Sequence, residues 1–387
     1  MNAKKLSIYL HWPFCLSKCP YCDFMSIPTQ NDDELFEKYA ELLLLDLKNS
    51  LEKIDYDFQI ETIFFGGGTP SLMPAKGIEK ILKFLQTKTN ANAEISLEAN
   101  PATFDSQKMR DFKNAGINRI SLGIQSFSDT NLQFLGRIYD SHQVISSAEI
   151  VAKIFDNFSF DFIYGYERQT IKSFEKDLST AINFDCKHIS CYQLTFEEGT
   201  LFQKKLQSGI IKTISEEQEI LFYKFIDDFL KQNGIFRYEI SNYAKKGFEC
   251  KHNLAYWNYC DYLGVGPAAH GRIKSGNYKY ATEKIRNPFE WAEAIEEKQE
   301  SYSVFSKLNE EEILQEILIM KLRLVKELAL CDLYKEVSKN TVQKMISYKK
   351  LEFLHSQGLI KLQNPTKIRL TESGILKLNS IAEFLCS

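Results

Sequence analysis

Three cysteines near the start of the chain form a Cys-x3-Cys-x2-Cys loop, made of Cys15, Cys19 and Cys22. Such a loop can wrap three thiolates around one iron–sulfur cluster, and these clusters usually have four cysteine ligands. A cluster held by only three cysteines leaves one iron open to a substrate or cofactor. The spacing therefore predicts an iron–sulfur cluster with one open coordination position.

A structural zinc site is the main alternative, with His11 or another group as the fourth ligand. Structural zinc sites are closed and tetrahedral, and a fourth cysteine is missing from this loop. A disulfide is less favoured, because the nine cysteines are an odd number and no secretory signal is apparent. We therefore favour the cluster and expect a reducing, cytoplasmic environment.

The composition is that of a globular protein with two or three domains. The chain has 387 residues, of which 44% are hydrophobic and 26% are charged. The formal net charge of −3 gives no global basic field, so nucleic acid is not an expected partner. No apolar stretch reaches the roughly 18 residues of a membrane-spanning helix, so no transmembrane segment is expected.

Short β-rich runs recur along the first half of the chain, and each is followed by a helical pattern. Repeated units of this kind predict a parallel sheet. Six of them make a partial (β/α)6 barrel, an α/β fold in which chemistry sits at the C-terminal ends of the strands. The six predicted strands are residues 6–12, 62–65, 94–98, 119–124, 159–164 and 188–194.

The pattern changes after the predicted barrel. We assign residues 1–240 to the barrel, 241–300 to a connecting region and 301–387 to a C-terminal α+β domain that resembles a winged helix. A packing role that closes the barrel is the favoured interpretation. DNA binding is disfavoured, because acidic residues such as Glu310 and Glu336 dilute the basic ones.

Polar residues follow the predicted strands. The glycine run of Gly66, Gly67 and Gly68 comes after the second strand and can bring backbone N–H groups close to a ligand. It is not a phosphate-binding P-loop, because no Gly-Lys pair follows. Four polar side chains lie at or near the ends of the next strands, and together they predict a polar ligand across the barrel mouth. They are Glu98, Gln125, Arg137 and Asp161.

These motifs together resemble the radical SAM proteins, and within them the oxygen-independent coproporphyrinogen III oxidase-like group. The resemblance runs nearly end to end. The segments that carry it are residues 9–11, 15–24, 66–71, 98–101, 123–127, 136–137, 192–195, 252–257 and 269–271.

The resemblance implies a [4Fe–4S] cluster on Cys15, Cys19 and Cys22, with S-adenosylmethionine (SAM) chelating the open iron through its amino and carboxylate groups. Glycine backbone would meet the methionyl part, and carboxylate and amide side chains would meet the ribose and amine. The positions that match the family's SAM-binding residues are Tyr9, Phe24, Gly67, Gly68, Thr69, Glu98, Gln125, Arg137 and Asp161.

Two features favour the heme chaperone branch of this group over its decarboxylating oxidases. The oxidases carry a further cysteine where this chain has Phe24. The chain also has the His-Asn-x-x-Tyr-Trp motif of the chaperone branch, in which His252 is the expected axial heme ligand and Tyr256 and Trp257 would contact the macrocycle. His270 is the second choice of ligand. A hydrogen-bonded histidine in an aromatic core loop is the alternative.

The chaperone branch binds heme and passes it to acceptor proteins, among which membrane respiratory enzymes are expected, and homodimers fit the group. The alternative is an enzyme that decarboxylates coproporphyrinogen III.

Two departures from the family pattern lie at the predicted opening of the cofactor site. The turn after the fifth strand reads Gly-Tyr-Glu-Arg-Gln at residues 165–169, and Ala268 stands where the family often has glycine.

Overall fold

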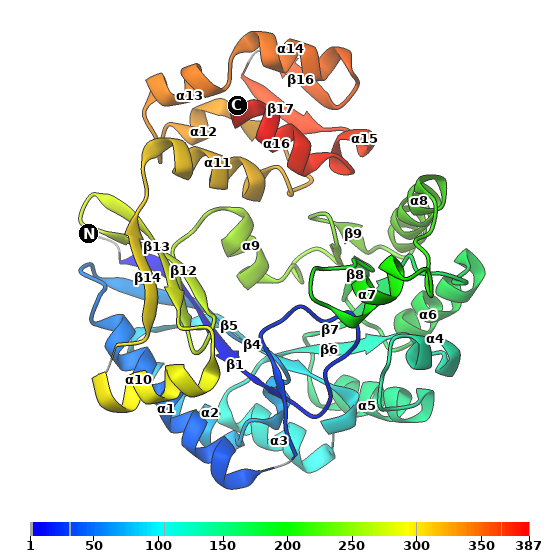
Figure 1. Ribbon diagram of the computed structural model, residues 1–387, viewed down its shortest axis with the longest axis vertical. Helices are drawn as coiled ribbons and strands as arrows, with labels where there is room; N and C mark the ends of the chain where they lie inside the picture. The colour runs from blue at the N-terminus through cyan, green and yellow to red at the C-terminus, as the bar shows by residue number, and fades with distance from the viewer. Residues whose placement is uncertain (1–2, 31, 104, 299, 365, 387) are drawn as a thin grey trace.

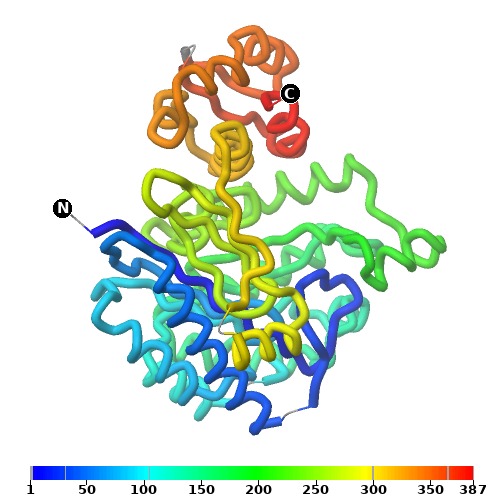
Figure 2. Tube along the Cα trace, turned by 60° about the vertical axis from the view of Figure 1, so that its left-hand side comes forward, coloured from blue at the N-terminus to red at the C-terminus, as the bar shows by residue number. Residues whose placement is uncertain are grey.

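The computed structural model describes residues 3–30, 32–103, 105–298, 300–364 and 366–386. A large curved sheet fills the lower lobe in Figure 1, and a smaller lobe at the C-terminus sits above it, next to α9 (Lys251–Trp257). Figure 2 shows the same two lobes from another side, joined through the segment that follows β14 (Tyr302–Lys307).

Six parallel strands form the centre of the sheet, in the order in which they occur in the chain. Each contains one of the predicted strands almost entirely, so the predicted parallel β/α arrangement is confirmed. Most residues of these strands are buried, as is typical of a parallel sheet. The strands are β1 (Lys4–Trp12), β4 (Phe58–Gly67), β5 (Thr89–Ala99), β6 (Arg119–Gln125), β7 (Phe158–Tyr164) and β8 (His188–Gln193).

The helices that follow these strands lie mainly on the outer face of the sheet (Figure 1). Asp105 caps one of them by accepting a hydrogen bond from the Lys108 backbone, and Gly116 ends the same helix at φ 115°. Glycine reaches this left-handed conformation without strain. The helices are α1 (Asp33–Leu51), α2 (Ala75–Leu85), α3 (Ser106–Ala115), α4 (Asp129–Phe134), α5 (Ser141–Ile154), α6 (Ile171–Asn183), α7 (Leu201–Gln207) and α8 (Glu216–Gln232).

The sheet continues past the six central strands at both edges. On one side β11 (Tyr262–Val265) pairs parallel to β1, and antiparallel β12 (His270–Ser275), β13 (Tyr278–Lys284) and β14 follow. On the other side β10 (Asn242–Ala244) and β9 (Phe236–Arg237) follow β8. The predicted connecting region therefore extends the barrel sheet, and α10 (Pro288–Lys298) packs against α1.

The C-terminal lobe has its own hydrophobic core and a three-stranded sheet in the order β15-β17-β16. Its mixture of short helices and a small sheet agrees with the predicted α+β domain. Its elements are α11 (Glu310–Lys321), β15 (Leu328–Ala329), α12 (Leu330–Leu333), α13 (Lys339–Met345), α14 (Tyr348–Ser356), β16 (Ile360–Asn364), β17 (Lys367–Leu370), α15 (Glu372–Ile375) and α16 (Leu378–Cys386).

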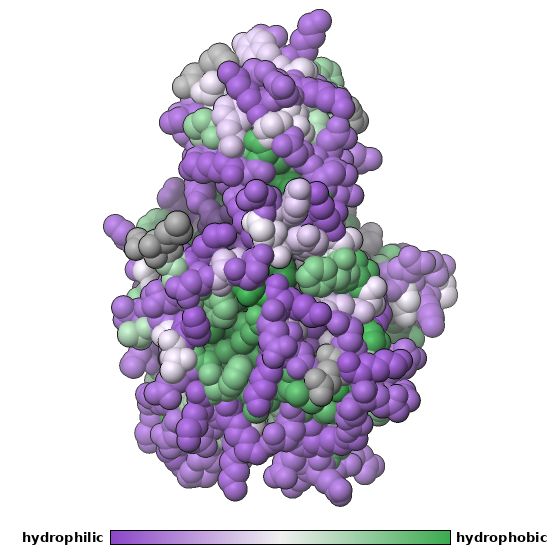
Figure 3. All heavy atoms as spheres, turned by 90° about the vertical axis from the view of Figure 1, so that its left-hand side faces the viewer, coloured by the Kyte–Doolittle hydropathy of each residue, from purple (hydrophilic) through white to green (hydrophobic). Residues whose placement is uncertain are grey.

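Polar residues dominate the side of the molecule drawn in Figure 3, with hydrophobic residues gathered near the middle of the lower lobe. Across the described residues, no helix combines the length and apolar character that crossing a membrane requires.

Candidate functional site

The cysteine loop leaves the end of β1 and folds back beside it. Cys15 ends the two-residue strand β2 (Phe14–Cys15), which pairs with β3 (Ile27–Pro28) and closes the loop at its base. The Cys22 amide donates to the Cys19 carbonyl at 3.1 Å, which turns the chain between these two cysteines. Cys15 is buried, whereas Cys19 and Cys22 are partly exposed.

The three thiols lie close enough to influence one another electrostatically. Burial raises the pKa of Cys15, a contact with the Ser26 hydroxyl opposes this, and the neighbouring Cys22 and Cys19 thiols raise it further. Within the described ranges, no three His, Cys, Asp or Glu side chains converge as ligands of a single metal ion. An iron–sulfur cluster requires a different arrangement, because each of its cysteines binds a different iron. Three neighbouring cysteines on one closed loop provide that donor set.

His11 does not fit the role of a fourth ligand. Its Nδ1 lies 3.0 Å from the Tyr9 hydroxyl and its Nε2 lies 2.8 Å from the Met25 carbonyl oxygen. Burial lowers the pKa of His11 to about 4, although the Met25 carbonyl opposes the shift. Both ring nitrogens are therefore engaged in holding the base of the cysteine loop.

The glycine run packs against the strand that carries the first cysteine. The Gly68 amide donates to the Trp12 carbonyl at 2.7 Å, and the Thr69 amide donates to the Phe14 carbonyl at 2.8 Å. A Cβ atom on Gly68 would lie only 2.6 Å from the Phe14 carbonyl oxygen, and one on Gly67 only 2.7 Å from the Trp12 carbonyl oxygen. Gly67 also has φ 116°. These glycines therefore position the cysteine loop as well as face a ligand.

Two acidic side chains of the barrel interior lie near each other at the predicted ligand site. Glu98 accepts a hydrogen bond from the Gly67 amide at 3.1 Å. Burial, and then the charge of Asp161, raise the pKa of Glu98 to about 8. Ser121 donates to Oδ2 of Asp161 at 2.7 Å, while Oδ1 is buried with no hydrogen-bond partner among the described residues. A ligand carrying a positive charge and hydrogen-bond donors would suit this pair.

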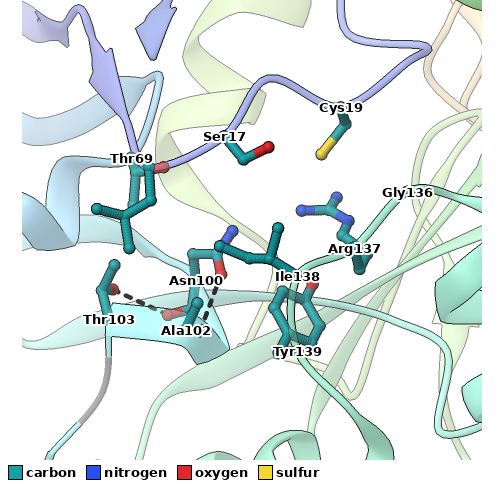
Figure 4. A pocket seen from close by; sticks show the side chains of 11 residues that line it. Ser17, Cys19, Thr69, Asn100, Ala102, Thr103, Gly136, Arg137, Ile138 and Tyr139 are labelled. Atoms are coloured by element: carbon teal, nitrogen blue, oxygen red, sulfur yellow. Dashed lines mark hydrogen bonds between the residues drawn. The ribbon is translucent and has the colours of Figure 1, made fainter. Parts of the chain in front are cut away.

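Arg137 lies beside the cysteine loop. Figure 4 shows Cys19 and Arg137 pointing into the same narrow space, with Thr69 and Asn100 on its opposite side. The Arg137 guanidinium donates to the Tyr21 hydroxyl and stacks on the rings of Tyr21 and Tyr139. Its Nε is buried with no hydrogen-bond partner among the described residues. The guanidinium could therefore bind a carboxylate at the cluster edge.

Gln125 ends β6, and it is the predicted site residue with the most unusual backbone. It is buried and has φ 67°, a left-handed conformation that a non-glycine residue adopts rarely. Residues held this way cluster at functional sites, because the surrounding structure must impose the conformation. The structure places Gln125 beside β7, where Phe162 is its register partner.

A pocket of about 500 Å³ opens above the barrel mouth and joins four of the nine predicted SAM residues to the aromatic motif. Its size falls in the usual range for small-molecule and cofactor sites. It brings together six of the predicted residues, which are Tyr9, Phe24, Gly67, Glu98, Tyr256 and Trp257. The same pocket is lined by residues for which sequence analysis predicted no site role, namely Glu283, Arg286 and Met320, and by the second-choice ligand His270.

His252 does not line this pocket. It is 1% exposed, its Nδ1 lies 2.7 Å from the Thr62 hydroxyl, and its Nε2 lies 2.8 Å from the Tyr256 hydroxyl. Its ring also stacks on Phe64 at 5.0 Å. Burial lowers the pKa of His252 to about 3. This geometry matches the alternative, a hydrogen-bonded histidine in an aromatic cluster, and the role of His252 as axial heme ligand stays a prediction.

The residues that sequence analysis missed have no local signature. Arg286 and Glu283 flank the end of β13, and Met320 belongs to α11 in the C-terminal lobe. They reach the pocket only because β12 and β13 extend the sheet beside β11 and because α11 sits above α9. A prediction of the extended sheet would have been needed to find them.

Comparison with known proteins places these features in a family. Residues 9–181 match the family model of the radical SAM superfamily. The heme chaperone HemW of Buchnera aphidicola subsp. Schizaphis graminum is 41% identical over 280 residues, covering 70% of this chain and 71% of that protein. HemW of Escherichia coli K12 is 36% identical over 289 residues, covering 73% and 74%. Among solved structures, coproporphyrinogen III oxidase (HemN) from Escherichia coli shares the fold, with a TM-score of 0.83, 20% identity, and coverage of 100% and 91%.

Proposed function

The chain belongs to the radical SAM superfamily and, within it, to the family of the heme chaperone HemW, and on this basis we propose that it is a heme chaperone. In this proposal it binds a [4Fe–4S] cluster, SAM and heme, and it transfers heme to acceptor hemoproteins. The observation that supports it best is the pocket shared by four of the predicted SAM residues, Tyr9, Phe24, Gly67 and Glu98, and by Tyr256 and Trp257.

The residues present fit the cluster and SAM. Cys15, Cys19 and Cys22 would hold the cluster, and SAM would chelate its open iron through the amino and carboxylate groups. Arg137, beside Cys19, offers an unpaired Nε to a carboxylate. The glycine run sets the position of Cys15 through the backbone contacts between Gly68 and Phe14.

The acidic pair of Glu98 and Asp161 would orient the ligand from the barrel side. With a pKa of about 8, Glu98 carries its proton at neutral pH and can donate as well as accept a hydrogen bond. A cationic ligand would favour its ionised form and leave a charge-assisted contact. The unpaired Oδ1 of Asp161 offers a further acceptor. These two side chains would therefore contact the positively charged and hydrogen-bond-donating parts of a ligand.

The aromatic residues would bind the macrocycle. Tyr256 and Trp257 present flat surfaces to the pocket from α9, and Met320 adds an apolar contact from α11.

We further propose that the acceptors include respiratory enzymes of a membrane, that the chaperone works in the cytoplasm, and that it forms homodimers. Size-exclusion chromatography with light scattering tests the last point.

The central test uses the full chain purified and reconstituted without oxygen. We expect about four irons per chain and tight binding of added ferric heme, followed by its transfer to the apo form of a hemoprotein. Cys15→Ser should abolish the iron content. Cys331→Ser, at an exposed cysteine in the C-terminal lobe, is the matched control and should leave it intact. Failure of the wild-type chain to bind heme at micromolar concentration would overturn the chaperone function.

The same preparation tests the enzymatic alternative. Incubation with SAM, a reductant and coproporphyrinogen III should yield no protoporphyrinogen at catalytic turnover. Phe24, where an oxidase carries a cysteine, is 58% exposed at the pocket edge and offers no thiol there. Multiple turnovers would favour the oxidase, whose fold this chain shares.

A further inference from the structure

His270 is the histidine that the structure leaves available in the pocket. Of the six histidines, His11 and His270 line it, and both ring nitrogens of His11 are engaged. The His270 side chain is 59% exposed. No hydrogen bond to its ring is found among the described residues, and the nearest acidic group, Glu283, lies 3.9 Å from its Nε2. An imidazole in this position can coordinate iron without first breaking a hydrogen bond.

The other histidines are committed elsewhere or lie outside the pocket lining. His252 is buried behind Tyr256, with both nitrogens engaged. His188 is buried and bonds to the Tyr238 hydroxyl. His355 bonds to a backbone carbonyl in the C-terminal lobe. His142 lies on α5 and is exposed. His270 is therefore the imidazole best placed for a ligand in the pocket.

The backbone of His270 is held firmly by the sheet. His270 is the register partner of Glu283 on β13. A Cβ atom on Gly264 would lie 2.1 Å from the His270 carbonyl oxygen, so only glycine lets β11 approach this close. This requirement gives a structural reason for the glycine at position 264. A ligand on a rigid strand keeps its position when the pocket is filled.

Arg286 supplies a charge suited to the acidic side chains of heme. It lies two residues beyond the end of β13, is exposed, and lines the same pocket. No salt bridge involving Arg286 is found among the described residues, which leaves its guanidinium available. Guanidinium groups bind carboxylates in a bidentate manner. A heme with its iron near His270 would carry its two propionates at one edge of the macrocycle, where one cation can bind them.

We propose that His270 is the axial ligand of the heme iron and that Arg286 binds a heme propionate, while His252 positions Tyr256 from behind. This inference rests on the proposed heme-binding function and names the residues that carry it out. In the bond that forms, the imidazole nitrogen donates its lone pair to the iron, with no change in oxidation state. The apolar sides of the macrocycle then contact Tyr256, Trp257 and Met320.

The test is a titration of the full anaerobic chain with ferric heme, monitored by the Soret band. We expect His270→Ala to shift the Soret maximum and to weaken binding at least tenfold. Added imidazole should restore the wild-type spectrum, because it can enter the space left by the side chain. His142→Ala is the matched control and should leave spectrum and affinity unchanged. Circular dichroism of each variant confirms that the fold persists.

A second variant tests the charge contact separately. Arg286→Gln should weaken binding of heme at least fivefold while leaving its Soret maximum in place, and it should not weaken binding of heme dimethyl ester, which has no free propionates. His252→Ala should keep the wild-type Soret maximum. An unchanged spectrum and affinity in His270→Ala, or loss of the ligand spectrum in His252→Ala alone, would overturn the assignment. If the wild-type chain binds no heme, the proposed function itself fails.

Discussion

A methyl group added at Gly68 should remove the iron–sulfur cluster without unfolding the protein. The new Cβ would lie 2.6 Å from the Phe14 carbonyl oxygen, whereas ordinary contact begins at 3.4 Å. The strand that carries Cys15 would have to move by about 0.8 Å. Metal ligands tolerate deviations of roughly 0.2 Å, so the displaced thiol no longer fits its iron. Overpacking of this kind costs about 1–3 kcal/mol of stability.

The matched control is Gly77→Ala, because its Cβ would lie 2.6 Å from the Cβ of Ala40, between α2 and α1 and away from the loop. Both variants should lower the free energy of unfolding by similar amounts in urea titrations. After anaerobic reconstitution, Gly68→Ala should hold less than half the wild-type iron, and Gly77→Ala should hold all of it. Full iron content in Gly68→Ala would refute the reasoning that the glycine run positions the cysteine strand.

Three further predictions concern buried polar groups. The folded-state pKa of Glu98 is raised to about 8, so the stability that this side chain contributes is present below its ordinary pKa of 4.5 and is lost as pH rises through 8. In urea titrations between pH 5 and 8, Glu98→Gln should therefore flatten the decline of the free energy of unfolding with pH. An unchanged slope would contradict the raised pKa. Asp46→Ala should lower the free energy of unfolding by about 3–5 kcal/mol in the same assay, because it leaves the buried ammonium of Lys284, 2.7 Å away, without its counter-charge. Adding Lys284→Met should recover part of this loss. Tyr256→Phe should cost about 1–3 kcal/mol of thermal stability, because Nε2 of His252 loses its partner; an unchanged melting temperature would show that this hydrogen bond is not formed.

The fold could be predicted from the sequence because its signals are local. Most strands of the barrel are short runs rich in apolar residues that end at or just before a polar or glycine residue, and Gly116 marks a helix end in the sequence. The repeat of strand and helix then fixes a parallel sheet, since parallel strands need a crossover. The rows of polar residues at the strand ends follow directly from that topology.

The role of the glycine run could be predicted only in part. The sequence indicates that the backbone approaches something closely at Gly67 and Gly68, and a ligand is the natural candidate. The structure shows that the space above these glycines is filled first by the carbonyl groups of Trp12 and Phe14. That contact joins strands more than 50 residues apart, and no local pattern carries information about it.

The orientation of α9 decides which histidine can reach the pocket. Glu94 on β5 accepts hydrogen bonds from the Lys251 and His252 amides, both at 3.1 Å, and so fixes the first turn of α9 to the barrel. Glu98 lies four residues further along the same strand and on the same face, since side chains alternate. One rigid strand therefore holds both the acid at the barrel mouth and the helix that presents Tyr256. For His252 to reach iron, α9 would have to rotate against this anchor and break two buried contacts of its ring, whereas His270 faces the pocket already.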